Sequence, residues 1–124
     1  MARILLVEDN EISREILSRR LRKAGHHIAE AGDGSQAISA ATHLHPDVIL
    51  LDMSLPGIDG WEAARELRAR RDTASIPLIA LTAHTLPSDR DRALQAGCDE
   101  FEPKPVELPR LLQKIETLLS RQHR

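Results

Sequence analysis

The chain contains few of the residues that mark secreted or membrane-bound proteins. Its 124 residues include a single cysteine, Cys98, which cannot form an internal disulfide bond and is expected to be a small packing residue. No apolar stretch is long enough to span a bilayer, and we expect no signal peptide. We therefore predict a reduced, cytoplasmic protein that does not contact a membrane.

Neither sign of charge is in large excess, and aromatic side chains are scarce. The 17 Lys and Arg residues are dispersed and stand against 19 Asp and Glu residues, so the sequence predicts no nucleic-acid partner. Trp61, which is expected to pack, and Phe101 are the only residues of their types, and tyrosine is absent. With 41% hydrophobic and 29% charged residues, the composition is that of one globular domain, which we assign to residues 1–124.

Five short segments have the pattern of β-strands. The runs at residues 4–7, 48–51 and 78–81 are continuous and apolar, which is typical of strands buried on both faces of a parallel sheet. Residues 28–31 and the segment around Phe101 carry more polar side chains, which favours the two edges of the sheet. This distribution predicts the strand order 2-1-3-4-5.

Helix signals lie between these strands. They are Asn10 as the cap of the first helix and Gly25 at its end, Asp59 with Glu62 at the start of the third, Ser88 to Gly97 for the fourth, and Pro109 before the repeating apolar positions of the fifth. Strict alternation of strands and helices predicts an α/β fold with right-handed crossovers. We expect a flavodoxin-like, doubly wound sheet of five parallel strands with five helices.

Polar side chains follow four of the predicted strands. They are Glu8 and Asp9 after the first strand, Asp52 and Thr82 at the ends of the third and fourth, and Lys104 after the fifth. The carboxyl ends of parallel strands meet at one edge of a sheet, so we expect these side chains to lie together. Carboxylates at close range repel one another, and a divalent cation relieves that repulsion. Because no His or Cys cluster accompanies them, the sequence predicts Mg²⁺ rather than zinc.

Several ordered motifs resemble those of a known family. Together, "VEDNE", "LLDMSLPGIDG", "ALTAH" and "FEPKP" resemble the response-regulator receiver domain of two-component signalling over essentially the whole chain. The segments "VEDN" and "GCDEFEPKP" are most similar to single-domain regulators and to receivers of hybrid histidine kinases. The resemblance implies a phosphorelay protein that is no enzyme beyond its own phosphorylation and dephosphorylation. It also implies a cis peptide bond before Pro105.

The same resemblance implies roles for the residues at the edge of the sheet. Asp52 would accept a phosphoryl group from a phosphohistidine on a histidine kinase or a histidine phosphotransfer protein, forming an acyl phosphate. Asp9 would bind Mg²⁺ directly, together with Asp52. Glu8 would bind the ion mainly through water, and Ser54 would contribute its backbone carbonyl.

Further residues are expected to read and tune the phosphorylated state. Thr82 and Lys104 would contact phosphoryl oxygens, and Phe101 stands at the family's switch-aromatic position. A downstream protein partner would then bind the face formed by the fourth helix, the fifth strand and the fifth helix. His84 and Ser54 would lie near the path of the hydrolytic water and adjust the lifetime of the phosphorylated state.

Two other function classes share parts of this pattern. A haloacid-dehalogenase-type phosphatase also uses Mg²⁺ and an aspartyl nucleophile, but it needs an Asp as general acid where this chain has Ser54. A flavodoxin-like electron carrier needs a Ser/Thr/Gly loop for the flavin phosphate, which Glu8 and Asp9 would repel. Within the receiver class, a single-domain regulator, a phosphorelay shuttle and a hybrid-kinase fragment stay open, and Met1 just before the first strand favours a standalone protein.

Overall fold

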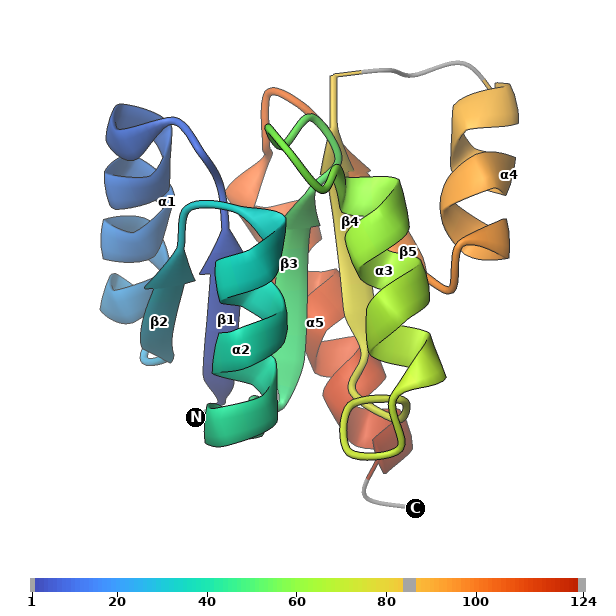
Figure 1. Ribbon diagram of the computed structural model, residues 1–124. Helices are drawn as coiled ribbons and strands as arrows, with labels where there is room; N and C mark the ends of the chain where they lie inside the picture. The colour runs from blue at the N-terminus through green and yellow to red at the C-terminus, as the bar shows by residue number, and fades with distance from the viewer. Residues whose placement is uncertain (1, 84–86, 123–124) are drawn as a thin grey trace.

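The computed structural model describes residues 2–83 and 87–122, which are built around a parallel sheet (Figure 1). The strands are β1 (Arg3–Val7), β2 (His27–Ala31), β3 (Val48–Asp52), β4 (Leu78–Thr82) and β5 (Glu100–Pro103). Every neighbouring pair is parallel, and the strand order is β2-β1-β3-β4-β5. The predicted flavodoxin-like architecture and strand order are confirmed.

Helices cover both faces of the sheet. They are α1 (Glu11–Lys23), α2 (Gly34–Leu44), α3 (Gly60–Ala69), α4 (Pro87–Gln95) and α5 (Leu108–Gln122). One core layer joins the sheet to α1 and α5 through residues such as Leu21, Leu111 and Ile115, and the other joins it to α2, α3 and α4. Figure 1 shows α2 and α3 in front of the sheet and α5 behind it.

Local sequence signals determine where the helices begin. The side chains of Asn10 and Asp59 each accept a hydrogen bond, at 2.9 Å, from the backbone N–H three residues later. These two caps confirm the predicted starts of α1 and α3. Helix α4 begins at Pro87, one residue earlier than predicted, because proline is compatible with the first helical turn. Helix α5 begins at Leu108, the residue before the predicted start signal Pro109.

Burial follows the strand order. Every residue of β3 and β4 is buried, whereas β2 at the edge is partly exposed. Cys98 and Trp61 are buried as predicted, and the guanidinium of Arg92 lies 4.3 Å from the centroid of the Trp61 ring. Burial raises the pKa of Cys98 to about 12, so this thiol is unreactive.

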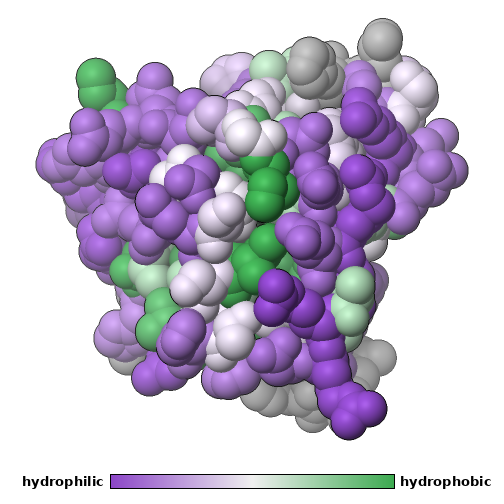
Figure 2. Space-filling view, in the orientation of Figure 1, coloured by the Kyte–Doolittle hydropathy of each residue, from purple (hydrophilic) through white to green (hydrophobic). Residues whose placement is uncertain are grey.

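The surface is largely hydrophilic on the side covered by α2 and α3. Figure 2 shows apolar side chains on this face mainly in the groove between the two helices. Ile38 and Ile58 line the groove together with polar neighbours such as Ser39 and Thr42. None of the described helices combines the length and the hydropathy needed to cross a membrane.

Candidate functional site

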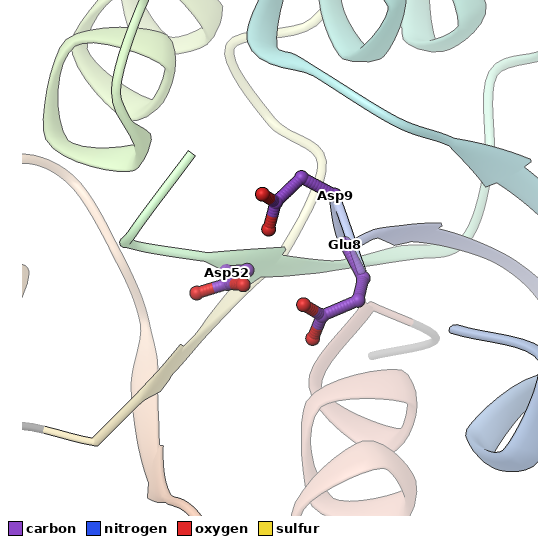
Figure 3. A group of neighbouring side chains, drawn as sticks. All are labelled: Glu8, Asp9 and Asp52. Carbon is purple, nitrogen blue, oxygen red and sulfur yellow. The ribbon is translucent and has the colours of Figure 1, made fainter. Parts of the chain in front are cut away.

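Three carboxylates meet at the carboxyl-terminal edge of the sheet. Asp52 is the last residue of β3, while Glu8 and Asp9 follow β1, the strand beside it. One carboxylate oxygen of each residue lies within 4.8 Å of the other two, and Figure 3 shows the three side chains converging. Glu8 is 5% exposed and Asp52 is 2% exposed, whereas Asp9 is open to solvent. These three residues, which we call the acidic pocket, combine buried negative charge with access from outside.

Lys104 partly neutralises the acidic pocket. Its Nζ atom lies 2.9 Å from Oε2 of Glu8 and 3.0 Å from Oδ2 of Asp52. The lysine follows β5, and its backbone N–H donates to the carbonyl of Thr82 at the end of β4 (2.8 Å). One ammonium group can balance one of the three carboxylates, so negative charge remains in excess at this edge.

The groups in the acidic pocket shift one another's pKa values. Burial and the hydrogen bond with Asp52 raise the pKa of Glu8 and outweigh the opposing effect of Lys104. Burial lowers the pKa of Lys104, but its hydrogen bonds with Glu8 and Asp52 outweigh burial and raise that pKa. Burial and the neighbouring Asp52 therefore both disfavour the ionised form of Glu8, and a cation bound between the carboxylates would favour it.

Backbone hydrogen bonds hold the acidic pocket in place. The N–H of Glu8 donates to the carbonyl of Ala31 (3.1 Å), and Nη1 of Arg14 donates to the carbonyl of Glu8 (2.8 Å). The N–H of Ser54 donates to Oδ1 of Asp52 (2.9 Å). Sequence reasoning missed Arg14, because no local pattern links an arginine on a helix to the carbonyl of a preceding strand end.

Gly60 is a second supporting residue that sequence reasoning missed. A Cβ at this position would lie 2.4 Å from Cα of Met53 and 2.5 Å from the carbonyl oxygen of Asp52. The loop after β3 can therefore close against the end of that strand only with glycine at the start of α3. The available signal was a glycine directly after the predicted cap Asp59, at a position where most residues form helices better.

The remaining predicted site residues lie in different surroundings. Thr82 ends β4 at the same edge and is fully buried, whereas Ser54 is exposed. Phe101 is 9% exposed and packs in the core layer of α2, α3 and α4. The peptide bond before Pro105 is cis, as the resemblance implies. His84 lies outside the described residues, so its predicted place near the path of the hydrolytic water stays a prediction.

The donor set fits a hard divalent cation. All three side chains of the acidic pocket offer carboxylate oxygens, which are ligands that Mg²⁺ and Ca²⁺ prefer. Within residues 2–83 and 87–122, no second group of three His, Cys, Asp or Glu side chains comes as close together. The acidic pocket is therefore a candidate Mg²⁺ site.

Comparisons with known proteins agree on one family. Residues 4–116 match the family model of the response regulator receiver domain. The polar-differentiation response regulator DivK of Brucella ovis is 32% identical over 116 residues, which cover 94% of each chain. The response regulator MprA of Mycobacterium leprae is 40% identical over 119 residues, which cover 96% of this chain and 51% of MprA.

A solved structure adds a relative that contains a metal ion. The receiver domain of a sensor histidine kinase from Pseudomonas aeruginosa PAO1 has 37% sequence identity and a TM-score of 0.89, covering 96% of this chain and 98% of that domain. A magnesium ion is coordinated in the active-site cleft of that relative. The likeness extends over nearly all of both chains, so it includes the strands that carry the acidic pocket.

Proposed function

The chain belongs to the receiver-domain family of response regulators, and on that premise we propose that it accepts a phosphoryl group on Asp52. The donor would be a phosphohistidine on a histidine kinase or a histidine phosphotransfer protein. Receiver domains act as signalling proteins rather than as classical enzymes. The observation that carries the proposal is the Asp52 carboxylate, which lies 3.0 Å from Nζ of Lys104 and beside two further carboxylates.

The site would supply charge neutralisation rather than base catalysis. A carboxylate is already ionised at neutral pH, so an oxygen of Asp52 can attack phosphorus without a general base. The bond from phosphorus to the imidazole nitrogen breaks, and the nitrogen keeps the electron pair. Lys104 would bind a phosphoryl oxygen, while the N–H of Ser54 keeps the carboxylate oriented. Mg²⁺, when held by Glu8, Asp9, Asp52 and the Ser54 carbonyl, would offset the remaining charge on the phosphoryl oxygens.

A small phosphodonor tests this proposal. Incubation with acetyl phosphate and Mg²⁺ should add a single phosphoryl group by intact mass, and Asp52→Asn should abolish the addition while leaving the fold intact. Asp59→Asn is a matched control, because Asp59 caps α3 outside the acidic pocket and asparagine caps helices equally well. Labelling that persists in Asp52→Asn would overturn the proposal.

The same experiment separates a receiver from a haloacid-dehalogenase-type phosphatase. That enzyme would need a carboxyl group at position 54, where Ser54 offers only a hydroxyl and a backbone N–H bonded to Asp52. A label that stops at one per chain supports the receiver. Repeated turnover of the phosphodonor by unmodified protein would support the phosphatase.

We further infer that the phosphorylated state is read at the surface formed by α4, β5 and α5. Thr82 and Lys104 would bind phosphoryl oxygens, and Phe101 on β5 would respond, so that a protein partner distinguishes two states of this surface. Beryllofluoride, which stands in for the phosphoryl group, should perturb amide NMR shifts across the surface. Lys104→Ala should keep some labelling and lose these shifts. Shifts confined to the acidic pocket and Thr82 would instead favour a phosphorelay shuttle.

The lifetime of the phosphorylated state is proposed to depend on His84 and Ser54. Ser54 supports this role because it is exposed and bonded to Asp52 through its N–H. The expected result is a changed dephosphorylation rate in His84→Ala and in Ser54→Ala, measured after removal of the phosphodonor. An unchanged rate in either variant would remove that residue from the proposal.

A further inference from the structure

Glu102 is a fully buried carboxylate that the proposed reaction does not use. It lies on β5 between Phe101 and Lys104 and has 0% exposure. Side chains alternate along a strand, so Phe101 packs toward α4 while Glu102 faces α5. A charge is rarely kept in such a position unless it is paired, so its partners indicate what the residue does.

Two cations of α5 bind Glu102 from positions one turn apart. Nε of Arg110 lies 3.1 Å and 3.0 Å from the two carboxylate oxygens, and Nη2 lies 2.7 Å from Oε2. Nζ of Lys114 lies 2.8 Å from Oε1 and also donates to the carbonyl of Phe101. We call Glu102, Arg110 and Lys114 the β5–α5 triad. Charge-assisted hydrogen bonds with this geometry are among the strongest polar contacts in proteins.

The β5–α5 triad attaches the first half of α5 to β5, the strand that directly precedes the proposed phosphoryl-binding Lys104. Lys104 lies two residues beyond Glu102. Lys114 also donates a hydrogen bond to the carbonyl of Phe101, which directly precedes Glu102. A displacement of the end of β5 would therefore be transmitted to α5 through the hydrogen bonds of Glu102 with Arg110 and Lys114. Apolar contacts are not directional and would let the strand shift along the helix. Phe101 offers a weaker route, because it is already 9% exposed and has little area left to bury.

The same cations also shape the outer surface of α5. Arg110 and Lys114 line a cavity of about 240 Å³ between β5 and α5, together with residues such as Glu100, Gln113 and Arg121. A shift of the β5–α5 triad would change both the shape and the charge of this surface. The triad thus connects the interior of the strand with a face that a partner can contact.

We propose that the β5–α5 triad transmits phosphorylation of Asp52 to α5 by making the end of β5 and the first half of α5 move as one body. Glu102 is then a positioning residue that acts through Lys104 and the two cations, without touching the phosphoryl group. This inference rests on the proposed function and adds the route by which the signal reaches the α5 surface.

NMR of the full chain with beryllofluoride and Mg²⁺ tests the inference in Glu102→Gln and Glu102→Leu. Both variants should keep the amide shifts around Asp52 and their labelling by acetyl phosphate, and should lose most of the shifts on α5. Glu107→Gln is the matched control, because Glu107 lies 3.5 Å from Arg110 but its side chain is 69% exposed. That variant should respond as the parent does. A merely structural role would not remove the α5 response selectively.

The outcomes separate this inference from the proposed function. If both Glu102 variants keep the full α5 response, the β5–α5 triad does not transmit the signal, although Asp52 still accepts the adduct. If the parent shows no response around Asp52, the proposed function fails and the transmission route fails with it. Glu102→Gln keeps the shape of the side chain, so a failure of Glu102→Leu to fold would leave the test in force.

Discussion

Two ionic clusters share the region around β5 and have opposite charge balance: Glu102 of the β5–α5 triad lies on the strand, and Lys104, which pairs with the acidic pocket, follows it. The acidic pocket sets three carboxylates against the ammonium of Lys104, whereas the β5–α5 triad sets the carboxylate of Glu102 against two cations. Burial acts to raise the pKa of both Glu8 and Glu102. The pKa of Glu8 is indeed raised. The pKa of Glu102 is lowered instead, because its hydrogen bonds with Arg110 and Lys114 outweigh burial.

The difference shows that partners, and not burial, decide what a buried carboxylate can do. In the acidic pocket the negative charge exceeds the available positive charge, and Asp9 keeps a path to solvent, so a cation can enter. In the β5–α5 triad every carboxylate oxygen already accepts charged hydrogen bonds. Because its carboxylate is already paired, this cluster does not require a bound cation. Its hydrogen bonds instead hold α5 against β5.

Removing both cations of the β5–α5 triad should have the largest effect on stability. Arg110→Met with Lys114→Met leaves Glu102 buried without a cation, with only the backbone N–H of Glu107 at 3.5 Å from its Oε2, and breaking a buried pair in this way costs about 3–5 kcal/mol. Chemical denaturation measures the free energy of unfolding. Lys104→Met is the comparison. It removes the cation of the acidic pocket, but the pocket is open to solvent, so added Mg²⁺ should restore the stability that is lost with the lysine. If the double variant were as stable as the parent, the cations of the β5–α5 triad would not be needed to compensate the buried charge of Glu102.

Acid should weaken the triad's contribution, which is the next largest effect. At neutral pH the parent should exceed Glu102→Gln by about 1.5–3 kcal/mol, the usual contribution of hydrogen bonds to a charged group. Because the folded pKa of Glu102 is lowered, this advantage is complete above the unfolded value of about 4.3 and is lost as the pH falls through the folded pKa. Unfolding measured from pH 7 down to acid pH should show the two proteins converging. A constant gap would contradict the ionised state of Glu102.

The sequence predicted the acidic pocket more completely than the β5–α5 triad. Apolar runs located the strands, and the rule for carboxyl ends of parallel strands collected Glu8, Asp9 and Asp52, because both signals are local. The polar character of β5 correctly predicted an edge strand, but Glu102 contributes to that polarity and is fully buried. Its burial depends on side chains 8 and 12 residues later that reach back from a helix, and no local period encodes that contact.

Mg²⁺ should stabilise the acidic pocket and leave the triad unaffected. At ten times its dissociation constant, Mg²⁺ should raise the free energy of unfolding by about 1.4 kcal/mol through mass action. Asp9→Asn should lose this response and, without metal, should be at least as stable as the parent, because it removes a like charge. Glu102→Gln should keep the full response. Equal melting temperatures of the parent with and without saturating Mg²⁺ would refute the metal site.

The smallest effect is expected where charges pair without burial. Arg19 and Glu15 lie 2.8 Å apart on α1, as close as Lys114 and Glu102, but their side chains are 78% and 69% exposed. Water screens such a pair, so Arg19→Ala should change the free energy of unfolding by about 0.3–0.5 kcal/mol, and less at high salt. Denaturation of Arg19→Ala beside Lys114→Ala compares two contacts of equal length that differ in burial. If the two losses were equal, distance alone would set the strength of ion pairs in this protein, and the contrast between its buried clusters and its surface would disappear.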